Sequence, residues 1–152
     1  MARRKKYNSG FYTPAYPEKY KGQHAPRWRS SWELQLFRLA DLHPNVVAWA
    51  SEAIKIPYYN PIKQKPAIYT PDVLMVFEDK HGNRRNELIE IKPSKHTHLE
   101  EAKTAYDRAQ FVINVAKWKA AQEFCKNHGM TFRVINENDI FRTQKKKKTQ
   151  KK

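Results

Sequence analysis

The stretch PDVLMVFEDKHGNRRNELIEIK, residues 71–92, decides the fold that we expect for this chain. Residues 72–77 are almost continuously apolar, which is typical of a central strand that is buried on both faces. Residues 79–83 (DKHGN) have the composition of a tight turn. Residues 87–92 (ELIEIK) form a second apolar strand that ends before Pro93. The stretch therefore predicts a hairpin at the centre of a sheet.

The hairpin also brings charged side chains to one end of that sheet. Glu90 and Lys92 project together, because side chains two residues apart on a strand share a face. Asp72 begins the neighbouring strand, within reach of Glu90. Two carboxylates and one ammonium suit metal-assisted hydrolysis of a phosphodiester, since Mg²⁺ prefers one or two carboxylates together with water and phosphate oxygens. On these residues alone, the polar face of an edge strand remains an alternative interpretation of Glu90 and Lys92.

The segments around the hairpin predict an α/β fold, with a mixed central β-sheet flanked by helices, over residues 30–142. We expect a first helix from Ser30 to about Leu42, followed by strands at 46–49 and 52–58 and a loop at 59–67. After the hairpin we expect a second helix from the capping box at Thr97 to about His128, with a break near Asn114. The chain then continues with a strand at 131–135 and a short turn capped by Asn136. Both helices begin at S/T-x-x-E capping boxes.

Glu33 has two interpretations. It is the third residue of the capping box that starts at Ser30, and this position needs no catalytic role to explain a glutamate. It is also a candidate third carboxylate, which the first helix would direct toward Asp72 and Glu90. The helix pattern does not choose between them.

The charge of the chain points to a polyanionic partner. There are 30 Lys and Arg residues against 15 Asp and Glu, so the formal net charge is +15. Much of the excess lies in two acid-free runs, at residues 1–6 and 145–152. We expect residues 1–29 to form a basic aromatic arm and residues 143–152 a disordered lysine-rich tail. Nucleic acid is the first candidate partner, because such runs bind phosphates by releasing counterions.

The arm and the tail contain the residues that we expect to contact nucleic acid. These are Arg3, Arg4, Lys5, Lys6, Lys19, Lys21, Arg27, Arg29, Lys145, Lys146, Lys147 and Lys148. Aromatic residues alternate with the cations of the arm, which suits stacking on bases. For each segment, an alternative to contact with nucleic acid stays open. The arm could fold over the domain or dock on another protein, and the tail could only improve solubility.

Several classes of protein are excluded by composition. No run of about 18 apolar residues is present to span a membrane. The basic start of the chain is not followed by the apolar stretch of a secretory signal. Cys125 is the only cysteine, so the chain can form neither an internal disulfide nor a multi-cysteine zinc site. We therefore expect an intracellular protein without a membrane partner.

The charged cluster and the segments around it resemble known nucleases. Tyr69-Thr70-Pro71-Asp72, the apolar strand and Glu90-Ile91-Lys92 resemble the PD-(D/E)XK nuclease superfamily, in which an upstream helical glutamate such as Glu33 in RSSWEL is also typical. The segments IPYYNPIKQKPAIYTPDVL and VINENDI are similar to the amino-terminal nuclease domain of Tn7-type transposition endonucleases. The segments YNSGFYTP, WRSSWEL, EIKPSK and AKWKAAQEFC look closer still to the head-completion nucleases of large contractile-tailed phages.

This resemblance, which covers most of the chain, implies a restriction-endonuclease-like core and Mg²⁺-dependent cleavage of DNA, with Mn²⁺ able to substitute. It implies that Asp72 and Glu90 ligate the metal with help from the Ile91 carbonyl, and that Lys92 positions the attacking water. It also implies that Glu33 holds a metal, either directly or through water. Composition and spacing do not establish these roles.

The resemblance further implies a role at the end of DNA packaging. The expected partners are double-stranded or branched DNA and the phage portal or capsid proteins, in the host cytoplasm or on the virion; the oligomeric state is not predicted. Two alternatives remain. One is a non-catalytic virion protein that binds DNA or plugs the portal, and the other is a nuclease subunit of a recombination or transposition system.

Overall fold

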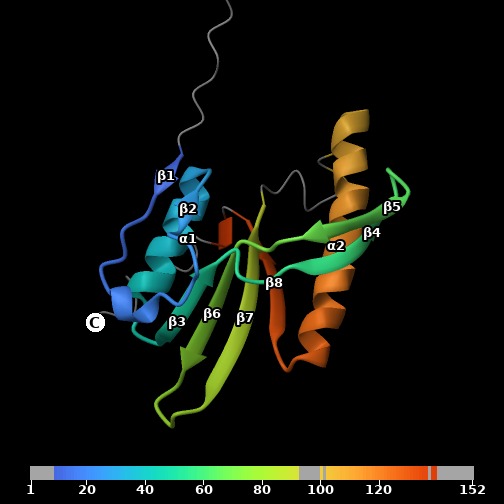
Figure 1. Ribbon diagram of the computed structural model, residues 1–152. Helices are drawn as coiled ribbons and strands as arrows, with labels where there is room; N and C mark the ends of the chain where they lie inside the picture. The colour runs from blue at the N-terminus through green and yellow to red at the C-terminus, as the bar shows by residue number, and fades with distance from the viewer. Residues whose placement is uncertain (1–8, 93–99, 101, 137, 140–152) are drawn as a thin grey trace, which may run out of the picture.

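The computed structural model describes residues 9–92, 100, 102–136 and 138–139. A four-stranded sheet lies at its centre (Figure 1). Its strands, in spatial order, are β3 (Val46–Ser51), β6 (Val73–Glu78), β7 (Arg84–Ile91) and β8 (Thr131–Ile135). The first three pair antiparallel, whereas β7 and β8 pair parallel. The sheet is therefore mixed, and the predicted α/β class is confirmed.

Two helices cover the sheet from opposite faces, because β6 and β7 alternate their apolar side chains between the two sides. Helix α1 (Ser31–Leu42) shares one core with Met75 and Ile89. Helix α2 (Ala105–Asn127) shares a second core with Leu88. Figure 1 shows the two helices on either side of the strands. No helix in the described part of the chain is long and apolar enough to cross a membrane.

The predicted hairpin of β6 and β7 is present. Its register pairs Val73 with Ile89 at one end. At the other end the Asp79 carboxylate accepts hydrogen bonds from the backbone N–H groups of His81 (2.8 Å) and Asn83 (3.0 Å). Gly82 supplies the positive φ, 80°, that this turn requires. The turn and the register together place Asp72, the residue before β6, beside Glu90 and Ile91 at the end of β7.

The prediction of a strand at 52–58 and a loop at 59–67 is only partly right, because the strand begins at Ile56 and the loop covers only residues 61–64. Strand β4 (Ile56–Asn60) and strand β5 (Lys65–Tyr69) form a separate two-stranded hairpin. Pro66 lies inside β5, opposite Tyr59. A two-stranded ribbon has an open edge on each strand, so a proline can be accommodated where a central strand would exclude it.

The second helix also differs from the prediction. Helix α2 begins at Ala105, with the Thr104 hydroxyl accepting the Asp107 N–H at 3.0 Å, and not at the box that starts at Thr97. Thr97 itself lies outside the described residues. The predicted break near Asn114 is absent: α2 is continuous through Asn114, which is buried. Gly129, with φ of 66°, ends the helical region as predicted.

The described part of the arm folds over the domain. It contains β1 (Gly10–Phe11), a 3₁₀ turn η1 (Pro17–Lys19) and β2 (Arg27–Trp28), where irregular structure was expected. The arm lies on the α1 side of the sheet (Figure 1), where the Tyr20 ring meets Trp49 of β3 edge-on. Of the two alternatives for the arm, packing on the domain therefore holds for the described residues.

Asp41, which the sequence did not single out, anchors this arm. Its carboxylate is fully buried and accepts hydrogen bonds from the Tyr12 hydroxyl and from the backbone N–H groups of Ala15 (2.7 Å) and Tyr16 (3.1 Å). Burial, followed by the hydrogen bond to Asp41, raises the pKa of Tyr12 to about 12. The Tyr12 hydroxyl therefore remains a donor through neutral and mildly alkaline pH.

Replacing Asp41 by Ala is expected to destabilise the protein by about 3 kcal/mol, because one buried hydroxyl and two backbone N–H groups lose their acceptor. Tyr12→Phe removes one of these bonds and is expected to cost about 1 kcal/mol. Chemical denaturation monitored by Trp fluorescence measures both. Glu18→Ala, an exposed acid in the same arm, is the control. Equal stability of Asp41→Ala and Glu18→Ala would contradict the anchoring role.

Candidate active site

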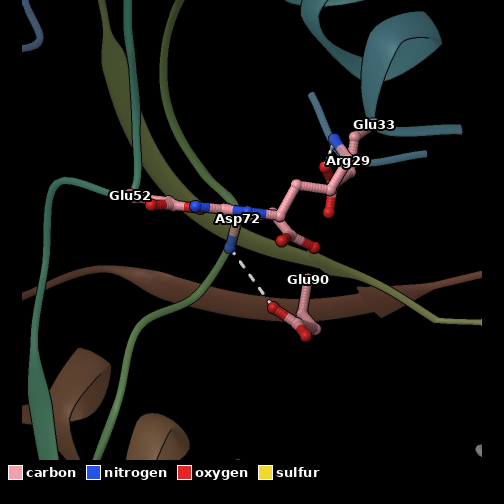
Figure 2. A network of polar contacts seen from close by, with 5 residues as sticks. All are labelled: Arg29, Glu33, Glu52, Asp72 and Glu90. Carbon is pink, nitrogen blue, oxygen red and sulfur yellow. Dashed lines mark hydrogen bonds and ion pairs between the residues drawn. The ribbon is translucent and has the colours of Figure 1, made fainter. Parts of the chain in front are cut away.

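Asp72 and Glu90 meet at the start of β6, as the hairpin register predicts. The backbone N–H of Asp72 donates to Glu90 Oε2 at 3.2 Å, and the backbone N–H of Ile91 donates to Asp72 Oδ2 at 2.8 Å. Figure 2 shows the first of these bonds as a dashed line. Each carboxylate thus accepts a backbone hydrogen bond from the other's strand, and the two acids are held side by side.

The pair is electrostatically costly. Glu90 is 4% exposed. Burial and then the charge of Glu90 raise the pKa of Asp72 well above its ordinary value. Burial likewise raises the pKa of Glu90, although the Lys92 ammonium partly offsets this. Two carboxylates held side by side, Glu90 buried and Asp72 half-buried, favour either a shared proton or a bound cation.

Lys92 supplies one positive charge to this pair. Its Nζ lies 3.5 Å from Glu90 Oε1. Its backbone N–H donates to the Ile135 carbonyl at 2.9 Å, which fixes the residue against β8. The predicted cluster of two carboxylates and one ammonium is therefore assembled, with one more negative charge than positive.

Glu33 lies in the first turn of α1, close to this cluster. The Ser30 hydroxyl accepts the Glu33 N–H at 3.1 Å, so the predicted helix cap forms. The Glu33 carboxylate accepts the Arg29 N–H at 2.5 Å. Its charge is near enough to contribute to the raised pKa of Asp72. Figure 2 shows Glu33 and Arg29 on one side of Asp72 and Glu90 on the other.

The donor set suits a hard cation that takes few protein ligands. Among the residues that the structure describes, no three His, Cys, Asp or Glu side chains come together closely enough to hold a metal ion. Glu33 is thus not gathered with Asp72 and Glu90 into one ligand set, and its metal role stays a prediction. Two carboxylates with an excess negative charge fit Mg²⁺, which commonly completes its shell with water and substrate oxygens.

The structure adds three residues on the α2 side that the sequence analysis missed. Lys117 Nζ lies 5.6 Å from the centre of the Tyr69 ring. Burial, followed by the nearby Lys92 charge, lowers the pKa of Lys117. Tyr69 Oη and Trp118 Nε1 are buried without a hydrogen-bond partner. Helical spacing could have indicated that Lys117 lies on the inner face of α2, because it is four residues from Ile113 and from Ala121, both of which are buried.

The residues expected to contact nucleic acid divide into three groups. Lys19 donates from Nζ to the carbonyls of Asp41 (2.6 Å) and His43 (3.1 Å), and the Arg29 guanidinium pairs with Glu52. Lys21 and Arg27 are exposed. The remaining predicted contacts lie outside the described residues: Arg3, Arg4, Lys5, Lys6, Lys145, Lys146, Lys147 and Lys148.

The comparisons with known proteins agree with this geometry. The family profile described as TnsA-like endonuclease N terminal matches residues 43–137, which include Asp72, Glu90 and Lys92. The chain belongs to this endonuclease family. More particularly, it is similar to the head completion nuclease of Enterobacteria phage T4, with 32% identity over 145 residues that cover 87% of this chain and 93% of that protein. The two resemblances inferred from the sequence are therefore confirmed.

Neutralising one acid of the pair is expected to stabilise the metal-free protein. The raised pKa of Asp72 means that the folded state holds a proton more tightly than the unfolded chain. Stability from this group is greatest below the unfolded pKa and is lost as pH rises through the folded one. In EDTA at pH 7.5, Asp72→Asn should therefore melt about 2–4 °C above wild type, a shift that corresponds to about 1 kcal/mol.

The difference between Asp72→Asn and wild type should shrink as the pH falls through the raised pKa of Asp72, because the wild-type carboxyl then takes up its proton. Glu123→Gln, an exposed acid on α2, is the control and should leave the melting temperature unchanged. An Asp72→Asn protein that melts below wild type at pH 7.5 would show that the pair does not repel in the folded state.

Proposed function

We propose that this chain is a divalent-metal-dependent DNA endonuclease that acts in phage head completion. The observation that carries the proposal is the hydrogen-bonded pair of Asp72 and Glu90 with Lys92 at the end of the β6–β7 hairpin. This cluster lies in a chain that aligns with 93% of the T4 head completion nuclease. We therefore transfer to this chain the activity and setting that the relative's name states.

The cluster divides the chemistry between its residues. Mg²⁺, when bound, neutralises phosphate oxygens and lowers the pKa of a coordinated water. Asp72 and Glu90 would hold the cation, with the Ile91 carbonyl as a further ligand, and Mn²⁺ would serve in its place. Lys92, held near Glu90, orients the water that attacks phosphorus. The bridging P–O bond then breaks, and the products are a phosphate monoester and a hydroxyl end, which together take up the atoms of that water.

Glu33 would contribute from α1, either as a metal ligand or through a bound water. Its charge already acts on Asp72. A moderate movement of the Glu33 side chain would break its hydrogen bond with the Arg29 N–H. The start of α1 would remain capped, because the Ser30 hydroxyl still accepts the Glu33 N–H. We assign Glu33 to the catalytic group on this basis, after Asp72, Glu90 and Lys92.

The substrate that we propose is the double-stranded or branched end of packaged DNA. The net charge of +15 favours a polyanion. The portal or capsid proteins would be the neighbouring partners, in the host cytoplasm or on the virion. A second candidate, the nuclease subunit of a transposition system, has the family match over residues 43–137 in its favour. The head-completion setting ranks first because that relative aligns over 87% of the chain.

Plasmid nicking tests the proposed activity. The wild-type protein should nick supercoiled DNA with Mg²⁺ or Mn²⁺ and not with EDTA. Asp72→Ala and Lys92→Ala should each lower the rate by at least about 10²-fold, because the first removes a proposed metal ligand and the second removes a cation that stabilises negative charge in the transition state.

Lys80→Ala is the matched control, since this lysine lies in the turn at the opposite end of the same hairpin. It should nick at the wild-type rate. A wild-type protein that never nicks DNA would favour the non-catalytic virion protein instead. Variants of Asp72 and Lys92 that nick as fast as wild type would show that the activity belongs to another site or to a contaminant.

A further inference from the structure

Lys117 is a half-buried lysine that has no carboxylate partner among the described residues. Its ammonium lies over two aromatic rings, 5.6 Å from the centre of Tyr69 and 5.9 Å from that of Tyr58. The nearby charges are Lys92, which repels it, and Glu90, which attracts it. Covered lysines are normally paired with an acid. The rings compensate only part of the missing hydration, so this cation is placed to receive an anion.

Unpaired donors lie beside Lys117. Tyr69 is 4% exposed, and its hydroxyl lies beside both the Glu90 carboxylate and the Trp118 indole, although neither makes a hydrogen bond of normal geometry with it. The indole N–H of Trp118, the next residue on α2, is buried as well. Tyr69 also lies close to Glu90, whose charge acts on its hydroxyl. Buried donors in folded proteins are nearly always satisfied. A cation without an acid partner, next to donors that lack a bond of normal geometry, therefore points to an acceptor that binds here.

We propose that Lys117 and Tyr69 form a phosphate-binding subsite on the α2 side of the Asp72–Glu90 pair. The ligand is a phosphate of the DNA backbone, held by the ammonium as a point charge and by the Tyr69 hydroxyl as a hydrogen-bond donor. Lys92 cannot serve both purposes, because its ammonium is already drawn to Glu90 Oε1 at 3.5 Å. The two lysines thus have different roles: Lys92 orients the attacking water, and Lys117 binds a phosphate of the DNA backbone.

This inference rests on the proposed function for its ligand, but its test does not need turnover. Lys117→Met keeps the length and the apolar stem that pack on the two rings, and it removes only the charge. Lys117→Arg restores a cation. Lys119→Met is the matched control, because Lys119 is exposed and two residues along a helix bring a side chain to a different face.

Binding of a 20-base-pair duplex is measured against salt concentration, with Ca²⁺ replacing Mg²⁺ so that the DNA stays intact. If Lys117 contacts a phosphate, the slope of log K against log salt should become shallower by about 0.9 in Lys117→Met. Lys117→Arg should regain most of the slope. Tyr69→Phe should keep the wild-type slope, because it removes no charge. Lys117→Met should melt at or above the wild-type temperature.

Nicking rates provide the second readout. Lys117→Met and Tyr69→Phe should each lower kcat/KM by about 10- to 10²-fold, as expected when one donor to the reacting phosphate is lost. A slope in Lys117→Met that equals wild type, or one that Lys119→Met reduces as much, overturns the subsite. If wild type itself does not nick DNA, the proposed function fails, and the salt slope still decides whether Lys117 binds phosphate.

Discussion

The exchange of hydrogen bonds between Asp72 and β7 is the constraint on which the site depends. The backbone register of β6 with β7 begins at Val73, and Asp72, the residue before it, contacts β7 through side chains. The Asp72 N–H reaches Glu90 and the Ile91 N–H reaches Asp72, at 3.2 and 2.8 Å. Two acids that repel each other are held together in this way. The cores on both faces of the sheet offset the cost, since Val73 and Leu88 beside them are fully buried.

The hairpin and the acid pair could be predicted from the sequence because they depend on local rules. An apolar run, a turn composition and the alternation of strand side chains suffice to bring Asp72, Glu90 and Lys92 together. The cap at Ser30 is similarly local, and it formed as predicted. These features are set by residues near one another in the chain, or by one hairpin register.

The missed features depend on packing between distant segments. Pro66 led to the prediction of a loop, but it lies in β5, where a two-stranded ribbon leaves one edge of each strand unpaired and tolerates a proline. This β4–β5 ribbon packs on α2. Asp41 looked like an ordinary helical acid until the arm, more than twenty residues earlier, placed three donors on it. Lys117 was one of many lysines, and only the position of Tyr69 against α2 shows that its charge faces the site. Such long-range placements leave little trace in a local pattern.

The central claim is that Asp72 and Glu90 hold a divalent cation, and a crystal grown with Mn²⁺ tests it most directly. Anomalous scattering locates the metal without reference to activity. We expect a peak within about 2.2 Å of one oxygen of each carboxylate, close to the distances that Mg²⁺ adopts with oxygen ligands. The Ile91 carbonyl should complete the protein ligands. A peak bound elsewhere, or no peak between Asp72 and Glu90 at saturating Mn²⁺, would contradict the claim.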